Sequence, residues 1–273
     1  MTEQRIKRLK TKIQESRSRL MSSNPFFALL LMYLKFIAVP DMKKMSTNGR
    51  CIYFSPDFAD KLYPAEMDFI LSHQIMHIIY GHIWRQEDLA GDNYHFACDI
   101  LINRLLEMNG FFEDRYTHLG YLYRAIPSVR MDVSKLTPEE IYDYLPYRLT
   151  MFDERTRNRF LADNDSFWDK KNDNGQAGIL IVDIPEPEGM LRKKDAPISG
   201  AGGTDAAGDD SGDRDLKRVW QTRAAVASKS MSGRVGGNGA GKVPKSIERM
   251  INKMKKPTVD WKVVFKKHVE KYS

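Results

Sequence analysis

Two histidines one helical turn apart, His73 and His77, are the residues of this chain best suited to chemistry. Side chains four positions apart on an α-helix project from the same face, so both imidazoles can reach one ion. Paired imidazoles are frequent zinc ligands. The segment His-Gln-Ile-Met-His therefore predicts a metal site on a helix, with Gln74 directly after the first ligand.

The residue after the first histidine departs from the zinc-hydrolase motif His-Glu-x-x-His. In that motif the glutamate is the general base, which takes a proton from a water activated by the metal. Gln74 has almost the shape of glutamate, but its neutral amide cannot accept that proton. We therefore expect a chain that binds metal but is inactive or impaired as a hydrolase. An inactivating substitution in a peptidase and a natural protein without activity both fit this sequence.

A third ligand must come from another segment, because two histidines do not complete a zinc site. His82 follows His77 by five positions, about 140° around a continuous helix, so we expect it to point away from the metal, at a helix end or on the surface. The segment 94–106 offers a better source. It carries His95, Asp99 and Asn103 at every fourth position among apolar residues.

Burying this polar stripe costs free energy unless an ion or hydrogen bonds compensate. Asp99 would give the metal an anionic oxygen, and Asn103 could accept a hydrogen bond from the second ring nitrogen of a ligating histidine. Alternatives stay open: His95 as the ligand, a surface ion pair for Asp99, and His118 as a donor to the oxyanion. The arrangement is similar to that of gluzincins, the thermolysin-like enzymes, whose third ligand is an acid on the next helix.

Composition favours a globular protein of the cytoplasm. The chain has 273 residues, of which 42% are apolar, and this is enough for a sizeable core. Its two cysteines are too few for a disulfide scaffold and suit a reducing compartment. The apolar run 26–34 is far shorter than the roughly 20 residues that cross a bilayer, and the charged N-terminus does not resemble a secretory signal. We therefore expect a cytoplasmic protein that makes no membrane contact.

The net charge of +7 owes much to a lysine-rich segment, residues 244–273. This segment has little aromatic interleaving, which nucleic-acid grooves usually show. We therefore interpret it as a basic helical segment that is solvated or binds a partner protein, and nucleic acid as an improbable ligand.

Hydrophobic periodicity predicts an α+β fold that is mainly helical and has a small antiparallel sheet. Asn48-Gly49 lies between β-prone runs and predicts a hairpin. Helices are expected over 3–20, 26–35, 64–86, 92–108 and from Thr137 onward, and a strand over 177–184.

The predicted organisation has three parts. Residues 1–192 form one zincin-like domain. Residues 193–243 are rich in Gly, Ala, Ser and Asp and are predicted to be a flexible loop, because few apolar side chains offset the entropy of ordering them. Residues 244–273 follow as the basic helical segment.

The chain resembles a bacterial family of metallopeptidase-type domains that precede a von Willebrand A-like (VWA-like) domain and are often encoded beside MoxR-type AAA+ ATPases. The resemblance rests on segments spread along the sequence: Asn24–Phe27, Thr47–Gly49, Leu71–His77, Gly81–His82 with Arg85, Ala97–Asn103, Glu139–Tyr142 and Val259–Trp261. In that family the position of Gln74 carries glutamate.

The resemblance implies that His73, His77 and Asp99 bind Zn²⁺ and that position 74 holds the general base. It also implies a protein or peptide substrate, and that the Asp-Trp segment leads towards a VWA-like domain absent from these 273 residues. The favoured hypothesis is a zinc metallopeptidase domain that is inactive or impaired because of Gln74. The alternative is a non-catalytic, zinc-stabilised adaptor that docks an AAA+ ATPase or a VWA-type protein.

Overall fold

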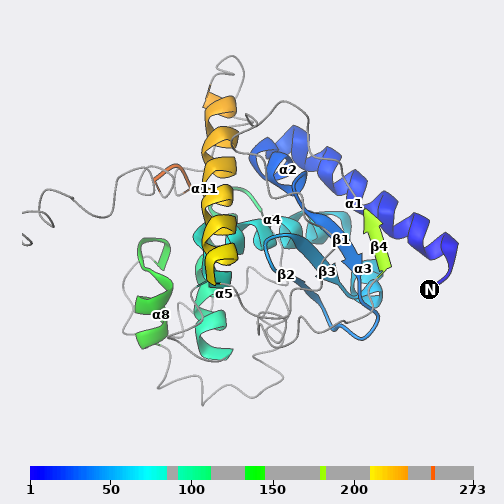
Figure 1. Cartoon of the computed structure of the whole chain (residues 1–273), viewed down its shortest axis with the longest axis horizontal. Coiled ribbons are helices and arrows are strands. Elements are labelled where there is room, and N and C mark those ends of the chain that lie inside the picture. Colours follow the sequence, from blue (N-terminus) through cyan, green and yellow to red (C-terminus); the bar gives the residue numbers. More distant parts are fainter. Residues whose placement is uncertain (85–91, 112–132, 145–178, 183–209, 233–246, 250–273) are drawn as a thin grey trace, which may run out of the picture.

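Helices surround a small sheet in the computed structural model, which describes residues 1–84, 92–111, 133–144, 179–182, 210–232 and 247–249 (Figure 1). The predicted α+β class, mainly helical, is confirmed. The elements are α1 (Glu3–Ser23), α2 (Pro25–Leu31), β1 (Lys35–Ala38), β2 (Met45–Thr47), β3 (Cys51–Phe54), α3 (Pro56–Lys61), α4 (Pro64–Tyr80), η1 (His82–Trp84), α5 (Asp92–Glu107), η2 (Val133–Lys135), α8 (Pro138–Tyr144), β4 (Ile179–Val182) and α11 (Asp210–Ser232).

The sheet has the strand order β2-β3-β1-β4. The predicted hairpin at Asn48-Gly49 is confirmed, since β2 and β3 pair antiparallel and Gly49 has φ of 80°. The sheet as a whole is mixed rather than antiparallel, because β1 and β3 are parallel while β1 and β4 are antiparallel. After β1 the chain first builds the outer strand β2, and the hairpin then returns β3 between β2 and β1, so that β3 runs in the direction of β1.

Helix α4 runs through the centre of the described structure. It begins at Pro64, as predicted, and the Glu66 carboxylate accepts a hydrogen bond from the backbone N–H of Tyr63, at 2.6 Å. It contacts α1, α2, α5, α11 and β2. The helix ends at Tyr80 rather than near residue 86, because Gly81 adopts the left-handed conformation, with φ of 71°.

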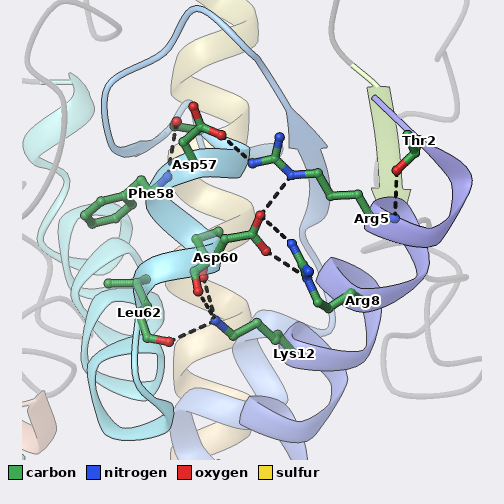
Figure 2. Close-up of polar contacts among 10 residues, drawn as sticks. Thr2, Arg5, Arg8, Lys12, Asp57, Phe58, Asp60 and Leu62 are labelled. Atoms are coloured by element: carbon green, nitrogen blue, oxygen red, sulfur yellow. Dashed lines mark hydrogen bonds and ion pairs between the residues drawn. The ribbon is translucent and has the colours of Figure 1, made fainter.

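Charged side chains fasten α1 to α3 (Figure 2). Arg5 and Arg8 both bind the Asp60 carboxylate, at 2.8 Å. The Lys12 ammonium donates to the backbone carbonyls of Ala59, Asp60 and Leu62 at 2.8–2.9 Å. Carbonyls at the end of a helix lack intrahelical donors, so Lys12 satisfies the C-terminal end of α3.

A further ion pair connects α1 directly to α4. The Arg19 guanidinium lies 2.8 Å from the Asp68 carboxylate, on the first half of α4. The Arg19–Asp68 ion pair thus holds α4, the helix that carries His73 and His77, against α1.

Helix α11 corrects the prediction for residues 193–243. Residues 210–232 form a helix that contacts α2 and α4, and the rest of that range lies outside the described residues. Apolar residues recur at helical spacing and face the core: Leu216, Trp220, Ala224, Ala227 and Met231. The average composition of the segment concealed this stripe, because the small and polar residues around it dominate the count.

Trp220 anchors α11 to the tip of the hairpin. Its indole N–H donates to the backbone carbonyl of Gly49 at 2.7 Å, and the side chain is 1% exposed. The Arg223 guanidinium lies over the Tyr33 ring, 4.2 Å from its centroid. A segment far along the chain therefore belongs to the same core as the N-terminal elements.

None of the described helices combines the length and the apolar character that a membrane span requires.

Candidate metal centre

Helices α4 and α5 contact each other and contribute the polar side chains of one buried cluster. From α4 come His73 and His77, and from α5 comes Asp99, and all three are 0% exposed. Apolar neighbours on both helices enclose them, among them Ile70 and Ile102. Such burial indicates that the three polar groups interact with one another or with a bound ion rather than with bulk water.

The three side chains converge on one point. The Nε2 atoms of His73 and His77 are 2.8 Å apart, and they lie 3.2 Å and 3.1 Å from the Oδ1 atom of Asp99. Ligand atoms that share a tetrahedral ion at about 2 Å lie roughly 3.3 Å from one another. The spacing of these three atoms is close to that value.

The chemistry of the donors also fits a metal ion. Two imidazole nitrogens and one carboxylate oxygen, all facing each other in a dry environment, form the donor set that zinc binds in hydrolytic enzymes. Within the described residues, His73, His77 and Asp99 are the group that can hold a metal ion.

Asn103 holds the first histidine from its other side. The Nδ1 atom of His73 lies 2.8 Å from the Asn103 side-chain oxygen. An amide oxygen only accepts hydrogen bonds, so Nδ1 carries a proton, and Nε2 is the ring nitrogen left to bind an ion. Asn103 is 1% exposed and follows Asp99 by one turn of α5, as the polar stripe predicted.

The Asp99 carboxyl group is ionised at neutral pH. Burial acts to raise its pKa, but the neighbouring His95 and His73 and the hydrogen bonds from His73 and His77 outweigh burial and hold the pKa well below the ordinary value of 3.8. The cluster therefore contains an anionic oxygen, which a divalent cation prefers over a neutral one.

His82 lies just beyond the end of α4 and outside the group that can share one ion, as predicted, but it is buried against His77 and does not point away. It is 0% exposed, and its Nδ1 atom lies 3.3 Å from the Nδ1 atom of His77. The prediction that it points away from the metal face extended α4 through residue 82, whereas the helix ends at Tyr80 and Gly81 turns the chain. Gly81, directly after the last residue of α4, was the signal in the sequence that could have placed His82.

Three other residues were considered for the site from the sequence: His95, Gln74 and His118. His95 is buried, and its Nε2 atom lies 3.4 Å from Asp99 Oδ1, but it is outside the group of three that share one ion site. Gln74 is 0% exposed on α4, directly after His73. His118 lies outside the described residues.

The sequence profile of a family described as "Putative metallopeptidase domain" matches residues 8–273. No curated protein and no solved structure matches the chain. Since the profile covers nearly the whole sequence, and the buried donor set is of the kind that metallopeptidases use, the chain belongs to this metallopeptidase-domain family.

Proposed function

We propose that the chain is a zinc-binding metallopeptidase domain whose hydrolytic activity is lost or reduced because Gln74 occupies the position of the general base. The observation that carries the proposal is the convergence of His73, His77 and Asp99 in a fully buried cluster next to Gln74. Membership of a metallopeptidase family supports the reaction class, which is peptide-bond hydrolysis.

The roles of the residues follow from their chemistry. His73, His77 and Asp99 would hold the zinc ion, and Asn103 fixes the ring of His73. When bound, zinc polarises the scissile carbonyl and acidifies a water molecule.

A glutamate at position 74 would take a proton from the attacking water and pass it to the leaving amine. The Gln74 amide can do neither, and loss of general-base catalysis typically lowers rates by about 10² to 10⁴-fold.

The substrate in this proposal is a protein or peptide. Among the described strands, β2 is an edge of the sheet and contacts α4. A peptide that paired with β2 as an added strand would run past the helix that carries both histidines. A cytoplasmic location completes the proposal, supported by Cys51 and Cys98, which form no disulfide with each other.

The proposal is tested in two steps. First, the metal content and zinc affinity of the purified protein are measured beside those of His77→Ala. We expect near-stoichiometric zinc in the former and a large loss of affinity in the latter. Absence of zinc binding in both proteins would contradict the metal site.

Second, Gln74→Glu is assayed against a broad peptide library, with Gln14→Glu on the exposed face of α1 as the matched control. We expect cleavage by Gln74→Glu that a chelator abolishes, and no gain in the control. If Gln74→Glu binds zinc but cleaves no member of the library, the peptidase assignment fails while the metal site stands.

A second candidate function is a zinc-stabilised adaptor that docks an AAA+ ATPase or a VWA-type protein. The observation that favours it is that the donor set joins α4 to α5 while position 74 has no base. In this case a chelator lowers the melting temperature and abolishes capture of the partner, and Gln74→Glu captures it as well as the parent chain but cleaves nothing.

A further inference from the structure

The two ring nitrogens of His77 face different neighbours. Its Nε2 atom faces the cluster, 2.8 Å from His73 Nε2 and 3.1 Å from Asp99 Oδ1. Its Nδ1 atom lies 3.3 Å from the Nδ1 atom of His82, and the two rings meet edge to face with an interplanar angle of 75°. His82 therefore approaches the side of the ring that cannot bind the shared ion.

The end of α4 brings His82 to this position. Gly81 has φ of 71° and ψ of 25°, and its N–H donates to the carbonyl of Ile78 at 3.0 Å. A Cβ added to Gly81 would meet no atom closer than 3.5 Å, so glycine is favoured here by its left-handed conformation rather than by lack of space. The 3₁₀ turn His82–Trp84 follows and leaves His82 fully buried.

We propose that His82 is a positioning residue for the metal centre, and this inference rests on the proposed zinc site. His77 Nδ1–H donates a hydrogen bond to His82 Nδ1, and this bond directs the Nε2 atom of His77 at the point that it shares with His73 and Asp99. The orientation of the ring is then set by a neutral imidazole from the turn after its own helix.

The arrangement around His73 provides a parallel. Asn103 accepts a hydrogen bond from His73 Nδ1 at 2.8 Å, so each of the two histidines has a buried side chain at its Nδ1 atom. The partner of His73 comes from α5, whereas the partner of His77 comes from the turn after α4. Loss of such partners typically weakens metal affinity by about 10 to 100-fold.

The test uses the whole protein with its six histidines labelled with ¹⁵N. Long-range ¹⁵N–¹H correlation spectra of the zinc-loaded protein report which ring nitrogen of His77 carries the proton and how fast that proton exchanges with water. His82→Phe keeps a buried ring but removes the acceptor. His82→Asn keeps an acceptor near the position of Nδ1 and is the matched rescue variant.

We expect the proton of His77 on Nδ1 in the parent protein. We expect this proton to exchange faster, and zinc to bind about 10 to 100-fold more weakly, in His82→Phe, with most of both changes reversed in His82→Asn. Circular dichroism shows whether each variant is folded. If His82→Phe fails to fold, the His77 tautomer in the parent protein and the zinc affinity of His82→Asn decide the matter.

Two results would overturn the inference: a proton on Nε2 of His77 in the zinc-loaded parent protein, or a folded His82→Phe with an unchanged exchange rate of the His77 proton and unchanged zinc affinity. Failure of the proposed function gives a different pattern. In that case neither the parent protein nor any variant binds zinc, and the inference fails together with the proposed site.

Discussion

The Nδ1 atom of His73 lies 2.8 Å from the side-chain oxygen of Asn103, so a residue of α5 orients a histidine of α4. The same helix supplies Asp99 one turn earlier, and Asp99 Oδ1 lies 3.2 Å from the other nitrogen of that ring. One neighbouring helix therefore contacts both ring nitrogens of His73. The candidate metal site can form only if α4 packs against α5.

Replacing Asn103 tests this orientation. Asn103→Leu removes the acceptor but keeps the size of the side chain, and we expect zinc affinity to fall by about 10 to 100-fold. Asn109→Ser, beyond the end of α5, is the control and is expected to leave the affinity unchanged. Competition with a chromophoric chelator measures both. An equal loss in the two variants would indicate general damage to α5 instead.

The pH dependence of stability tests the state of Asp99. Its pKa is lowered in the folded chain, despite burial, so the ionised carboxylate stabilises the fold above the ordinary value of 3.8, and this stabilisation is lost as the pH falls through the lower folded value. We expect the free energy of unfolding of the metal-free parent protein to exceed that of Asp99→Asn at neutral pH, and the difference to shrink in acid. Urea unfolding at a series of pH values measures it, and a difference that grows in acid would contradict the assignment.

Lys12 tests how the end of α3 is stabilised. Lys12→Met keeps the aliphatic stem but leaves three carbonyls without their donor, and we expect the protein to lose about 1–3 kcal/mol of stability. Lys10→Met on the exposed face of α1 is the control and should change the stability little. Thermal unfolding compares the two. Zinc affinity should remain unchanged in both, because neither residue contacts the cluster.

Trp220 tests whether α11 is part of the core. Trp220→Ala removes a buried indole and its hydrogen bond to Gly49, and we expect a loss of about 3–5 kcal/mol. Arg218→Ala, exposed on the same helix, should cost little. Chemical denaturation provides the comparison. A Trp220→Ala protein as stable as the parent would show that α11 does not contribute to the fold.

Much of the candidate site could be predicted because its information is local. The four-residue spacing of His73 and His77 specifies one helical face, and the same spacing of Asp99 and Asn103 specifies another. When two mostly apolar helices bury their polar stripes, placing the stripes against each other avoids leaving polar groups unpaired. The hairpin could likewise be predicted from a short segment, Asn48-Gly49 and the residues beside it.

The features that the sequence did not reveal depend on where helices end and on contacts between distant segments. The direction of the His82 side chain was predicted from its rotation around a continuous helix. The left-handed residue Gly81 ends α4, so that rotation does not apply to His82. Helix α11 was missed because its average composition resembles a linker, while the surface that stabilises it is provided by α2, α4 and the hairpin. The parallel pairing of β1 with β3 likewise follows from the path of the chain and not from either strand alone.

The hydrogen bond from Trp220 to Gly49 joins residues 171 positions apart. The ribosome releases the hairpin and α4 long before it synthesises α11. A nascent chain that ends before residue 210 therefore exposes the Gly49 carbonyl and the Tyr33 ring that α11 contacts in the finished protein. Closing a loop of this length has an entropic cost, so we expect docking of α11 to come late in folding and the surface that it covers to stay exposed until then.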